Sequence, residues 1–371
     1  MATIGFDGSR LSVAEPTGTE SYSAEILEVL AAIVGDDKLV VYLNGRASPP
    51  HLDLPPGVGL RPIPFPRIWT HGRLSWEMVR HPPDVLFVPA HVVPLRHPAT
   101  VVTVHDLGFL IEPDAHPAAA RRQLDWTTRW SVRAARTVIA ISETTKRALV
   151  GAYRLDPAKI RVIHHGVSPR FRRAGSEEIA GVRSRYGLPE RYVLTVGTVQ
   201  PRKNLPRLVE AMHRVRTAGL PHRLVIAGRD GWLAGTVHDA IAKSAGADLV
   251  TRLGYVSRGD LPALYSAADA FALPSLYEGF GLPLLEALAC GIPAVVSDRG
   301  ALPEVAGEAA LISDATDAQA FGDALVRVLT IRALRDQLIA AGLARVSAFR
   351  WERAAAQTLA VLREAIGDHL C

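Results

Sequence analysis

The chain has 371 residues, of which 48% are hydrophobic and 21% charged, a balance that excludes a disordered or fibrous protein. This length exceeds the usual size of one hydrophobic core, so two domains of roughly 150–200 residues are expected. The net charge of +5 suits an anionic ligand or an anionic membrane surface. No zinc-finger, helix-turn-helix or aromatic RNA-binding pattern indicates a nucleic-acid partner.

The cysteine content and the hydropathy pattern exclude further classes. Two cysteines, Cys290 and Cys371, are too few for a disulfide framework or a cysteine-based zinc site. The sequence contains no run of about 18 apolar residues, so no membrane span is predicted. The first residues also lack the pattern of a signal peptide. We therefore expect a cytoplasmic protein. Its oligomeric state is not indicated.

The first half of the chain alternates short apolar runs with helical patterns. Such strands, nearly all apolar and separated by helices, predict a parallel sheet covered on both faces. Ser142 is a candidate N-cap for the last helix. Strands are expected at residues 3–6, 38–43, 84–89, 100–105, 137–142 and 160–165, and helices at 21–34, 118–135 and 143–153.

The same pattern restarts after a polar segment, residues 168–189, whose Pro and Gly content is typical of an interdomain hinge. This predicts two domains, residues 1–172 and 173–350, followed by a C-terminal helix at 351–371 that packs on the first domain. Strands are expected at residues 191–197, 222–228, 248–254, 269–275 and 292–298, and helices at 206–218, 260–267, 283–289, 318–330 and 332–346.

The most informative segment is residues 273–298, LPSLYEGFGLPLLEALACGIPAVVSD. A strand leads into a loop whose glycines, Gly279 and Gly281, let the backbone approach a ligand closely. A helix is then expected to begin at Pro283, which suits a first helical position. The free amide groups at such a helix start favour the binding of a phosphate group.

Two carboxylates flank this pocket, Glu278 in the loop and Glu286 in the first turn of the expected helix. A carboxylate there is best explained by hydrogen bonds from a ribose diol. The Glu-x7-Glu spacing within EGFGLPLLEALACGIPAVVSD strongly resembles retaining glycosyltransferases of family 4, which have the GT-B fold. The resemblance implies that Glu286 binds the donor's ribose, that Glu278 lies near the donor sugar, and that backbone amides around Phe280 and Leu282 contact the nucleotide.

A second segment, VGTVQPRKNL at residues 196–205, places Arg202 and Lys203 at another junction between a strand and a helix. Two cations there would bind the donor diphosphate and stabilise the charge that grows on it as the glycosidic bond breaks. The family carries a Gly-Arg…Lys-Gly pattern here, whereas this chain has Thr198 in place of the arginine. It resembles the subgroup with an Arg-Lys-Asn sequence, which is mannosyltransferase-like. The alternative is an exposed basic turn.

In the first half, His105 ends the strand of TVVTVHDLGF. The resemblance implies that this histidine lies near the donor sugar and donates or accepts hydrogen bonds there. Gly18 and Thr19, in the loop before the first helix, are similar to the family's glycine loop, which faces the diphosphate and the acceptor. Any connection between a strand and a helix favours Gly and Thr, so this second signal is weaker.

The remaining site residues are Gly228, which ends a strand, and Tyr255, within RLGY, which resembles the family's base-contacting stretch. The chain has no Asp-x-Asp motif, no HExxH motif and no Cys/His cluster. We therefore expect no metal ion, and no cofactor apart from the donor substrate. The negative charge of the diphosphate is then expected to be balanced by Arg202, Lys203 and helix termini.

These observations predict an α/β protein of the GT-B fold, with two doubly wound Rossmann-like domains facing each other across a cleft. The expected function is transfer of a hexose from a nucleotide sugar to a hydroxyl acceptor, with retention of the anomeric configuration. GDP-mannose is the first donor expected and UDP-glucose the second. The alternatives are a nucleotide-sugar epimerase of the same fold and a non-catalytic protein that binds sugar nucleotides.

The acceptor is the least defined partner: a glycan, a lipid-linked sugar or a small molecule. Residues 59–81 hold four arginines with Trp69 and Trp76 and one acid, Glu77. Basic residues interleaved with tryptophan suit an anionic bilayer, which predicts peripheral contact with the inner face of the membrane. The alternative interpretation is a surface loop with ordinary packing aromatics.

Overall fold

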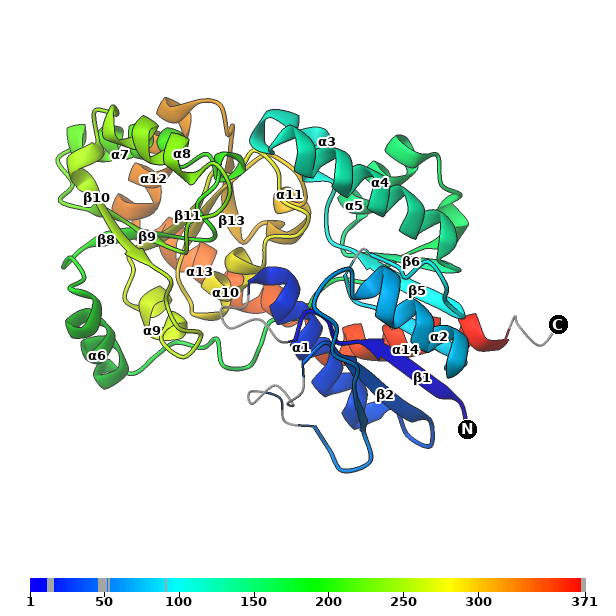
Figure 1. The fold of residues 1–371 in the computed structure, drawn as a ribbon. Helices are drawn as coiled ribbons and strands as arrows, with labels where there is room; N and C mark the ends of the chain where they lie inside the picture. Colours follow the sequence, from blue (N-terminus) through cyan, green and yellow to red (C-terminus); the bar gives the residue numbers. More distant parts are fainter. Residues whose placement is uncertain (12–16, 46–51, 53, 91, 368–371) are drawn as a thin grey trace. The chain divides into compact units, whose positions relative to one another are not determined.

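The computed structural model describes residues 1–11, 17–45, 52, 54–90 and 92–367. The chain forms two compact units, each a parallel sheet covered by helices (Figure 1). The first unit contains Met1–Leu107, Arg122–Gly166 and Arg350–Cys371, and the second contains Gly108–Arg121 and Val167–Phe349. The last helix of the chain thus belongs to the first unit.

The sheet of the first unit is parallel throughout and has the strand order β3-β2-β1-β4-β5-β6-β7. The order reverses between β1 and β4, as in a doubly wound fold. Its central strands are buried along their whole length, because helices cover both faces. The strands are β1 (Thr3–Asp7), β2 (Lys38–Leu43), β3 (Gly59–Pro62), β4 (Val85–Val88), β5 (Ala99–Val104), β6 (Thr137–Ala140) and β7 (Ile160–Val162).

The second unit repeats this topology, with the strand order β10-β9-β8-β11-β12-β13, again all parallel. The reversal here lies between β8 and β11. The strands are β8 (Tyr192–Val196), β9 (Arg223–Ala227), β10 (Val250–Gly254), β11 (Ala270–Leu273), β12 (Ala294–Ser297) and β13 (Ala310–Ser313).

Helices occupy most of the remaining described chain. Those before residue 167 are α1 (Gly18–Ile33), the π-helical turn η1 (Thr70–Leu74), α2 (Ser75–Arg80), α3 (Gly108–Ile111), η2 (Pro113–Ala115), α4 (Ala118–Ala134), α5 (Glu143–Tyr153) and η3 (Pro157–Lys159). Those after it are α6 (Ser176–Tyr186), η4 (Pro201–Lys203), α7 (Leu205–Thr217), α8 (Ala234–Ala242), η5 (Ala247–Leu249), α9 (Leu261–Ser266), α10 (Leu282–Ala289), α11 (Leu302–Ala306), α12 (Ala318–Thr330), α13 (Arg332–Val346) and α14 (Trp351–Gly367).

The expected strands and helices are confirmed, and the expected bounds of β2, α5, α12 and α13 match the structure to the residue. The Ser142 side chain caps α5 by accepting a hydrogen bond from the Thr145 amide. The sequence did not predict β3, β13, α2, α3, α8 and α11, and most of these elements are short. Strand β3 lies at a sheet edge and alternates half-buried and exposed positions, so it lacks an apolar run.

The interpretation of residues 168–189 as a hinge is wrong for its central part, which forms helix α6 of the second unit. The polar composition reflects a helix with mostly exposed side chains rather than a linker. Glu178 accepts a hydrogen bond from the Gly175 amide at 2.7 Å and pairs with Arg172. Gly187, with φ of +58°, ends the helix in the left-handed conformation that glycine favours.

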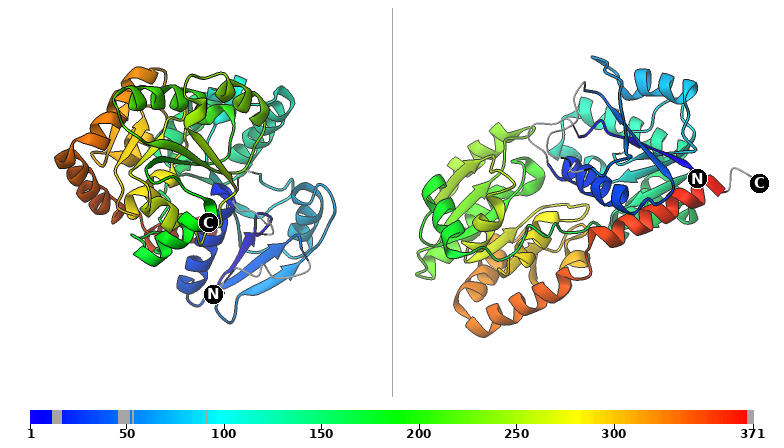
Figure 2. Two further views of the ribbon diagram at one scale, coloured as in Figure 1. Left: turned by 90° about the vertical axis from the view of Figure 1, so that its left-hand side faces the viewer. Right: turned by 90° about the horizontal axis from the view of Figure 1, so that it is seen from below.

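The C-terminal helix α14 packs along α1, and both contribute to the core of the first unit (Figure 2). Trp351, its first residue, is buried against Tyr22 and His165. Gly166 permits this contact, since a Cβ atom at that position would lie 2.2 Å from the Trp351 amide nitrogen. The last helix is therefore an integral part of the first unit.

We predict that Gly166→Ala destabilises the first unit by about 1–3 kcal/mol, because the added methyl group forces the backbone at Trp351 to move. Gly151→Ala is the matched control. Gly151 lies in the interior of α5 with open space at its Cβ position, so alanine there stabilises by about 0.5–1 kcal/mol. Urea unfolding of both variants measures the difference, and equal stability of the two would contradict the packing argument.

Candidate active site

In the second unit, the loops after β8 and β11 meet at the point where the strand order reverses. Ligands of doubly wound sheets bind at this place, outside the carboxyl ends of the strands. The first loop contains η4 with Arg202 and Lys203, and the second contains Glu278. The two loops are joined by a hydrogen bond from the Leu276 amide to the Arg202 carbonyl at 2.9 Å. The two expected segments thus come together in one site.

A buried ion cluster occupies this junction. Lys203 Nζ lies 2.5 Å from Glu278 Oε1, and Arg202 Nη1 lies 3.4 Å from Glu278 Oε2. Glu278 is only 7% exposed, and its Oε1 also accepts a hydrogen bond from the Ser275 hydroxyl at 2.7 Å. Arg202 Nη1 also donates to the Tyr277 carbonyl at 2.5 Å. The cluster holds two cations and one carboxylate and is net positive.

The charge state of Glu278 follows from these neighbours. Burial by itself would raise the pKa of the Glu278 carboxyl, but the charges of Lys203 and Arg202 and the hydrogen bonds from Lys203 and Ser275 lower it below its usual value. Glu278 is therefore ionised at neutral pH. An ionised carboxylate that is already committed to two cations is not a proton donor.

The backbone of the loop after β12 packs closely against the backbone of Glu278. Gly300, in the loop after β12, has φ of +62°, and a Cβ atom there would lie 2.4 Å from the Glu278 carbonyl oxygen. The next residue, Ala301, donates its amide hydrogen to that same carbonyl at 2.9 Å. Only glycine fits this position without moving the backbone that carries the carboxylate.

Glycines also clear the space beneath Lys203. A Cβ atom on Gly197 would lie 3.1 Å from Lys203 Cε, and one on Gly228 would lie 1.9 Å from the Gly197 carbonyl oxygen. The Gly228 amide donates to the Gly254 carbonyl at 2.7 Å, which joins the ends of β9 and β10. Tyr255 follows directly and is partly exposed. The structure thus places the expected residues Gly228 and Tyr255 at the same edge of the sheet as Lys203.

Helix α10 begins at Leu282, with Gly281 as its N-cap at φ of +102°. Pro283 is therefore the second helical residue, and Glu286 lies in the second turn, which corrects our expectation of the first turn. The helix starts one residue before the expected Pro283, because Gly281 can adopt the left-handed conformation that its backbone has at the N-cap. Phe280 is buried and packs edge-to-face on Phe349 at 5.8 Å, so its ring is not open to a ligand.

Glu286 is positioned by an aromatic hydroxyl from α9. The Tyr265 hydroxyl donates a hydrogen bond to Glu286 Oε2 at 2.8 Å. Burial, and then the charge of Glu286, raises the pKa of Tyr265 well above its ordinary value, so the phenol keeps its proton and remains a donor. Sequence reasoning missed Tyr265, although its place in the helix before β11 was a signal that could have been used.

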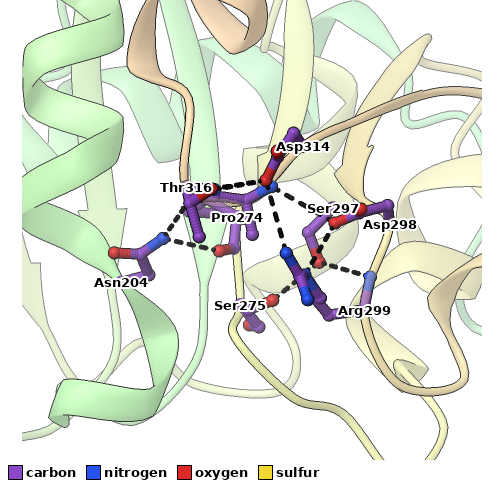
Figure 3. A network of polar contacts seen from close by, with 9 residues as sticks. Asn204, Pro274, Ser275, Ser297, Asp298, Arg299, Asp314 and Thr316 are labelled. Atoms are coloured by element: carbon purple, nitrogen blue, oxygen red, sulfur yellow. Dashed lines mark hydrogen bonds and ion pairs between the residues drawn. The ribbon is translucent and has the colours of Figure 1, made fainter.

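A network of polar contacts ties together the loops after β8, β11, β12 and β13 (Figure 3). Asn204 Nδ2 donates to the Pro274 carbonyl at 3.1 Å and to the Ala315 carbonyl at 2.7 Å. The Ser297 hydroxyl donates to the Ser275 carbonyl at 2.6 Å. Asn204 is the third member of the Arg-Lys-Asn sequence, and these contacts fix the end of the loop that carries Arg202 and Lys203.

In the first unit, His105 follows β5 and is buried. Its Nε2 lies 2.8 Å from the Pro89 carbonyl oxygen, which only accepts hydrogen bonds, so Nε2 carries the proton. Tyr22 packs edge-to-face on the His105 ring at 4.9 Å, and the His165 ring packs against Tyr22 in a tilted arrangement at 4.6 Å. Burial lowers the pKa of His105, and burial lowers that of His165 well below its usual value. Both rings are neutral at pH 7, with His105 Nδ1 deprotonated.

The expected residues Gly18 and Thr19 form the start of α1. Thr17 precedes them, and both its amide and its hydroxyl donate to the carboxylate of Glu20. A Cβ atom on Gly18 would have open space around it. The earlier part of this expected loop, residues 14–16, lies outside the described residues.

His105, Gly18 and Thr19 belong to the first unit, and all other expected site residues belong to the second. In the parts of the chain that the structure describes, no group of three or more His, Cys, Asp or Glu side chains is arranged to hold a metal ion. The described helices also include none that is both long and apolar enough to cross a bilayer.

Comparison with known proteins agrees with this arrangement. A family model described as "Glycosyl transferases group 1" matches residues 183–345, and one described as "Glycosyltransferase Family 4" matches residues 16–171. O-antigen chain mannosyltransferase B of Escherichia coli is 30% identical over 289 residues, which cover 77% of this chain and 76% of that protein. The chain belongs to glycosyltransferase family 4. It is accordingly a glycosyltransferase, as the sequence motifs indicate.

Other members of the family and solved structures extend this likeness. D-inositol 3-phosphate glycosyltransferase of Actinosynnema mirum is 32% identical over 340 residues, covering 88% of this glycosyltransferase and 76% of that protein. Sucrose-phosphate synthase of Thermosynechococcus elongatus superposes with a TM-score of 0.77 at 22% identity, covering 99% and 100% of the two chains. Anabaena HepE in complex with UDP-glucose has a TM-score of 0.73 at 17% identity, covering 98% and 100%. The expected GT-B fold is confirmed.

We predict that the first unit loses stability as the pH falls below about 6.5. His105 and His165 stay neutral in the folded state, whereas the unfolded chain takes up protons near the usual histidine pKa of about 6.5. Their contribution is fully present above pH 6.5 and is lost on acidification. Melting temperatures between pH 8 and pH 5 measure the loss.

His165→Phe should make the melting temperature less dependent on pH, because one buried neutral imidazole is replaced by a ring that does not titrate. His164→Gln is the matched control, since His164 is the exposed neighbour in the chain. A melting temperature that stayed constant or rose on acidification would contradict the neutral assignment.

Proposed function

We propose that this glycosyltransferase moves a hexosyl group from a nucleoside-diphosphate sugar to an acceptor hydroxyl, without a metal ion and with retention of the anomeric configuration. The observation that carries the proposal is the net-positive cluster of Arg202, Lys203 and Glu278 where the strand order reverses. The start of α10 follows Glu278 in the chain and supplies backbone amides for the same diphosphate.

Arg202 and Lys203 hold the diphosphate in this proposal. Glu278 balances one of their two charges, which leaves a surplus positive charge in a buried setting where electrostatic interactions are strong. Because Glu278 and the Tyr277 carbonyl already orient the two side chains, little reorganisation is needed as negative charge develops on the leaving group. The diphosphate charge is met by these side chains and by helix-start amides.

The chemistry follows from this placement. The bond between the sugar C1 and the diphosphate oxygen breaks, and the electron pair stays on the phosphate, stabilised by Arg202 and Lys203. The acceptor oxygen bonds to C1 on the same face, and its proton passes to the departing phosphate oxygen. Glu278 is ionised and paired with both cations, so no glycosidase-style pair of acid and base carboxyls is assigned.

Further residues have roles in this proposal. Glu286 accepts hydrogen bonds from the ribose hydroxyls, with Tyr265 holding one of its carboxylate oxygens. His105, neutral and protonated at Nε2, accepts a hydrogen bond from a sugar hydroxyl through Nδ1. Gly18 and Thr19 bring backbone toward the diphosphate and the acceptor, and Tyr255 contacts the base.

GDP-mannose is the donor we propose first, and UDP-glucose second. The Arg-Lys-Asn sequence and the likeness to an O-antigen chain mannosyltransferase support mannose. The solved structure of Anabaena HepE with UDP-glucose supports the second donor. The acceptor is a glycan, lipid-linked or small-molecule hydroxyl, and we place the enzyme in the cytoplasm at the inner face of the membrane.

The first test supplies purified enzyme with each donor, a mannose-terminated acceptor and EDTA, and records the product by NMR. We predict an α-linked product from GDP-α-mannose, and turnover that survives EDTA. Lys203→Ala and Arg202→Ala should each lower kcat by about 10²–10³-fold. Arg207→Ala is the control, because Arg207 is an exposed cation of α7 paired with Glu210. An inverted product, or full loss of activity in EDTA, would overturn the mechanism.

The second test measures nucleotide binding by calorimetry. We predict that Glu286→Ala raises the Kd for the nucleotide by about 10–100-fold, because hydrogen bonds to a charged group are lost. Tyr265→Phe keeps the carboxylate and removes only its partner, so a smaller increase is expected. Unchanged nucleotide affinity in Glu286→Ala would show that the ribose assignment is wrong.

A further inference from the structure

The short helix formed by η1 and α2 in the first unit has an unusual exposed face. Its buried side consists of Leu74, Ser75, Glu77 and Met78. The opposite side presents Trp76, which is 54% exposed, and Val79, which is 64% exposed. A helix on a protein surface normally turns polar residues to solvent, whereas this one turns a tryptophan and a valine outward.

The segment before the helix extends this apolar surface. Ile68 is 73% exposed and Phe65 is 43% exposed. Both lie beside Gly72, since a Cβ atom there would be 3.6 Å from Ile68 and 4.0 Å from Phe65. Gly72 is about one helical turn before Trp76. Ile68 also has φ of +48°, a costly conformation for a β-branched residue.

Arginines surround the same apolar side chains. The guanidinium groups of Arg73 and Arg80 lie 4.7 Å and 5.7 Å from the Trp76 ring, and Arg67 is exposed nearby in the chain. The single acid of residues 59–81, Glu77, is buried and paired with Arg61 at 2.5 Å and Arg73 at 2.8 Å. The exposed face therefore carries positive charge with no exposed carboxylate from this segment.

The other tryptophan of the segment has a different role. Trp69 is only 6% exposed, and its indole Nε1 donates to the Ile63 carbonyl at 2.8 Å. It anchors the segment to the first unit. Of the two interpretations of residues 59–81, ordinary packing thus applies to Trp69, and Trp76 requires another account.

We propose that Phe65, Ile68, Trp76 and Val79, with Arg67, Arg73 and Arg80, form a docking surface for an anionic lipid bilayer. The apolar side chains enter the region between headgroups and acyl chains, while the arginines contact lipid phosphates. An acidic protein or nucleic acid would match the charge but would leave the exposed isoleucine and valine without a partner. The docked enzyme then receives a lipid-linked acceptor; that last step alone rests on the proposed function.

The test is co-sedimentation of the full chain with vesicles of phosphatidylcholine, with or without 30 mol% phosphatidylglycerol. We expect binding to the anionic vesicles that weakens in 0.5 M NaCl, since salt screens the arginines. Trp76→Ser with Val79→Ser, and separately Arg67→Gln with Arg80→Gln, should each weaken binding by at least about tenfold.

Leu343→Ser with Arg332→Gln is the matched control, because it removes an exposed leucine and an exposed arginine from α13 in the second unit. Turnover of each variant with a soluble acceptor is measured in parallel and should be unchanged, which separates docking from the transfer reaction. No binding of the unaltered chain to anionic vesicles, or equal binding by the surface variants, would overturn the proposal.

Discussion

The pairing of Glu278 with Lys203 and Arg202 is the interaction on which the candidate active site depends. Three charges buried together are costly unless their geometry is good and their remaining hydrogen bonds are satisfied. Here the Ser275 hydroxyl and the Tyr277 carbonyl supply two of those hydrogen bonds, and the Ala301 amide holds the backbone of Glu278. The loops after β8 and β11 are consequently held in one arrangement, with a surplus positive charge facing the place where such sheets bind phosphates.

The two units contribute different electrostatics. The second unit contains the net-positive cluster of Arg202, Lys203 and Glu278, whereas the first contains a neutral aromatic cluster of Tyr22, His105, His165 and Trp351. The contribution of α14 to this cluster through Trp351 also explains why the C-terminal helix belongs to the first unit.

Much of the fold and the motifs of the site could be predicted from the sequence. Apolar strands alternating with amphipathic helices indicated the parallel sheets, and helices with strong periodicity such as α12 were predicted to the residue. Helix α6 was missed because its side chains are mostly exposed, and the strand β3 because it lies at an edge. Tyr265 and Ser275 were missed because hydrogen-bond partners from distant segments leave no local pattern.

The sequence by itself determined the residue types of the site and their order, because glycines, a helix start and charged residues after strands follow from local chemistry. Only the tertiary structure decided what each side chain does. It paired Glu278 with Lys203 across 75 positions of the chain, turned Glu286 toward Tyr265, and separated a buried Trp69 from an exposed Trp76. Such outcomes depend on which strands become neighbours and which helix faces are covered, and these are set by packing over the whole unit rather than by any one segment.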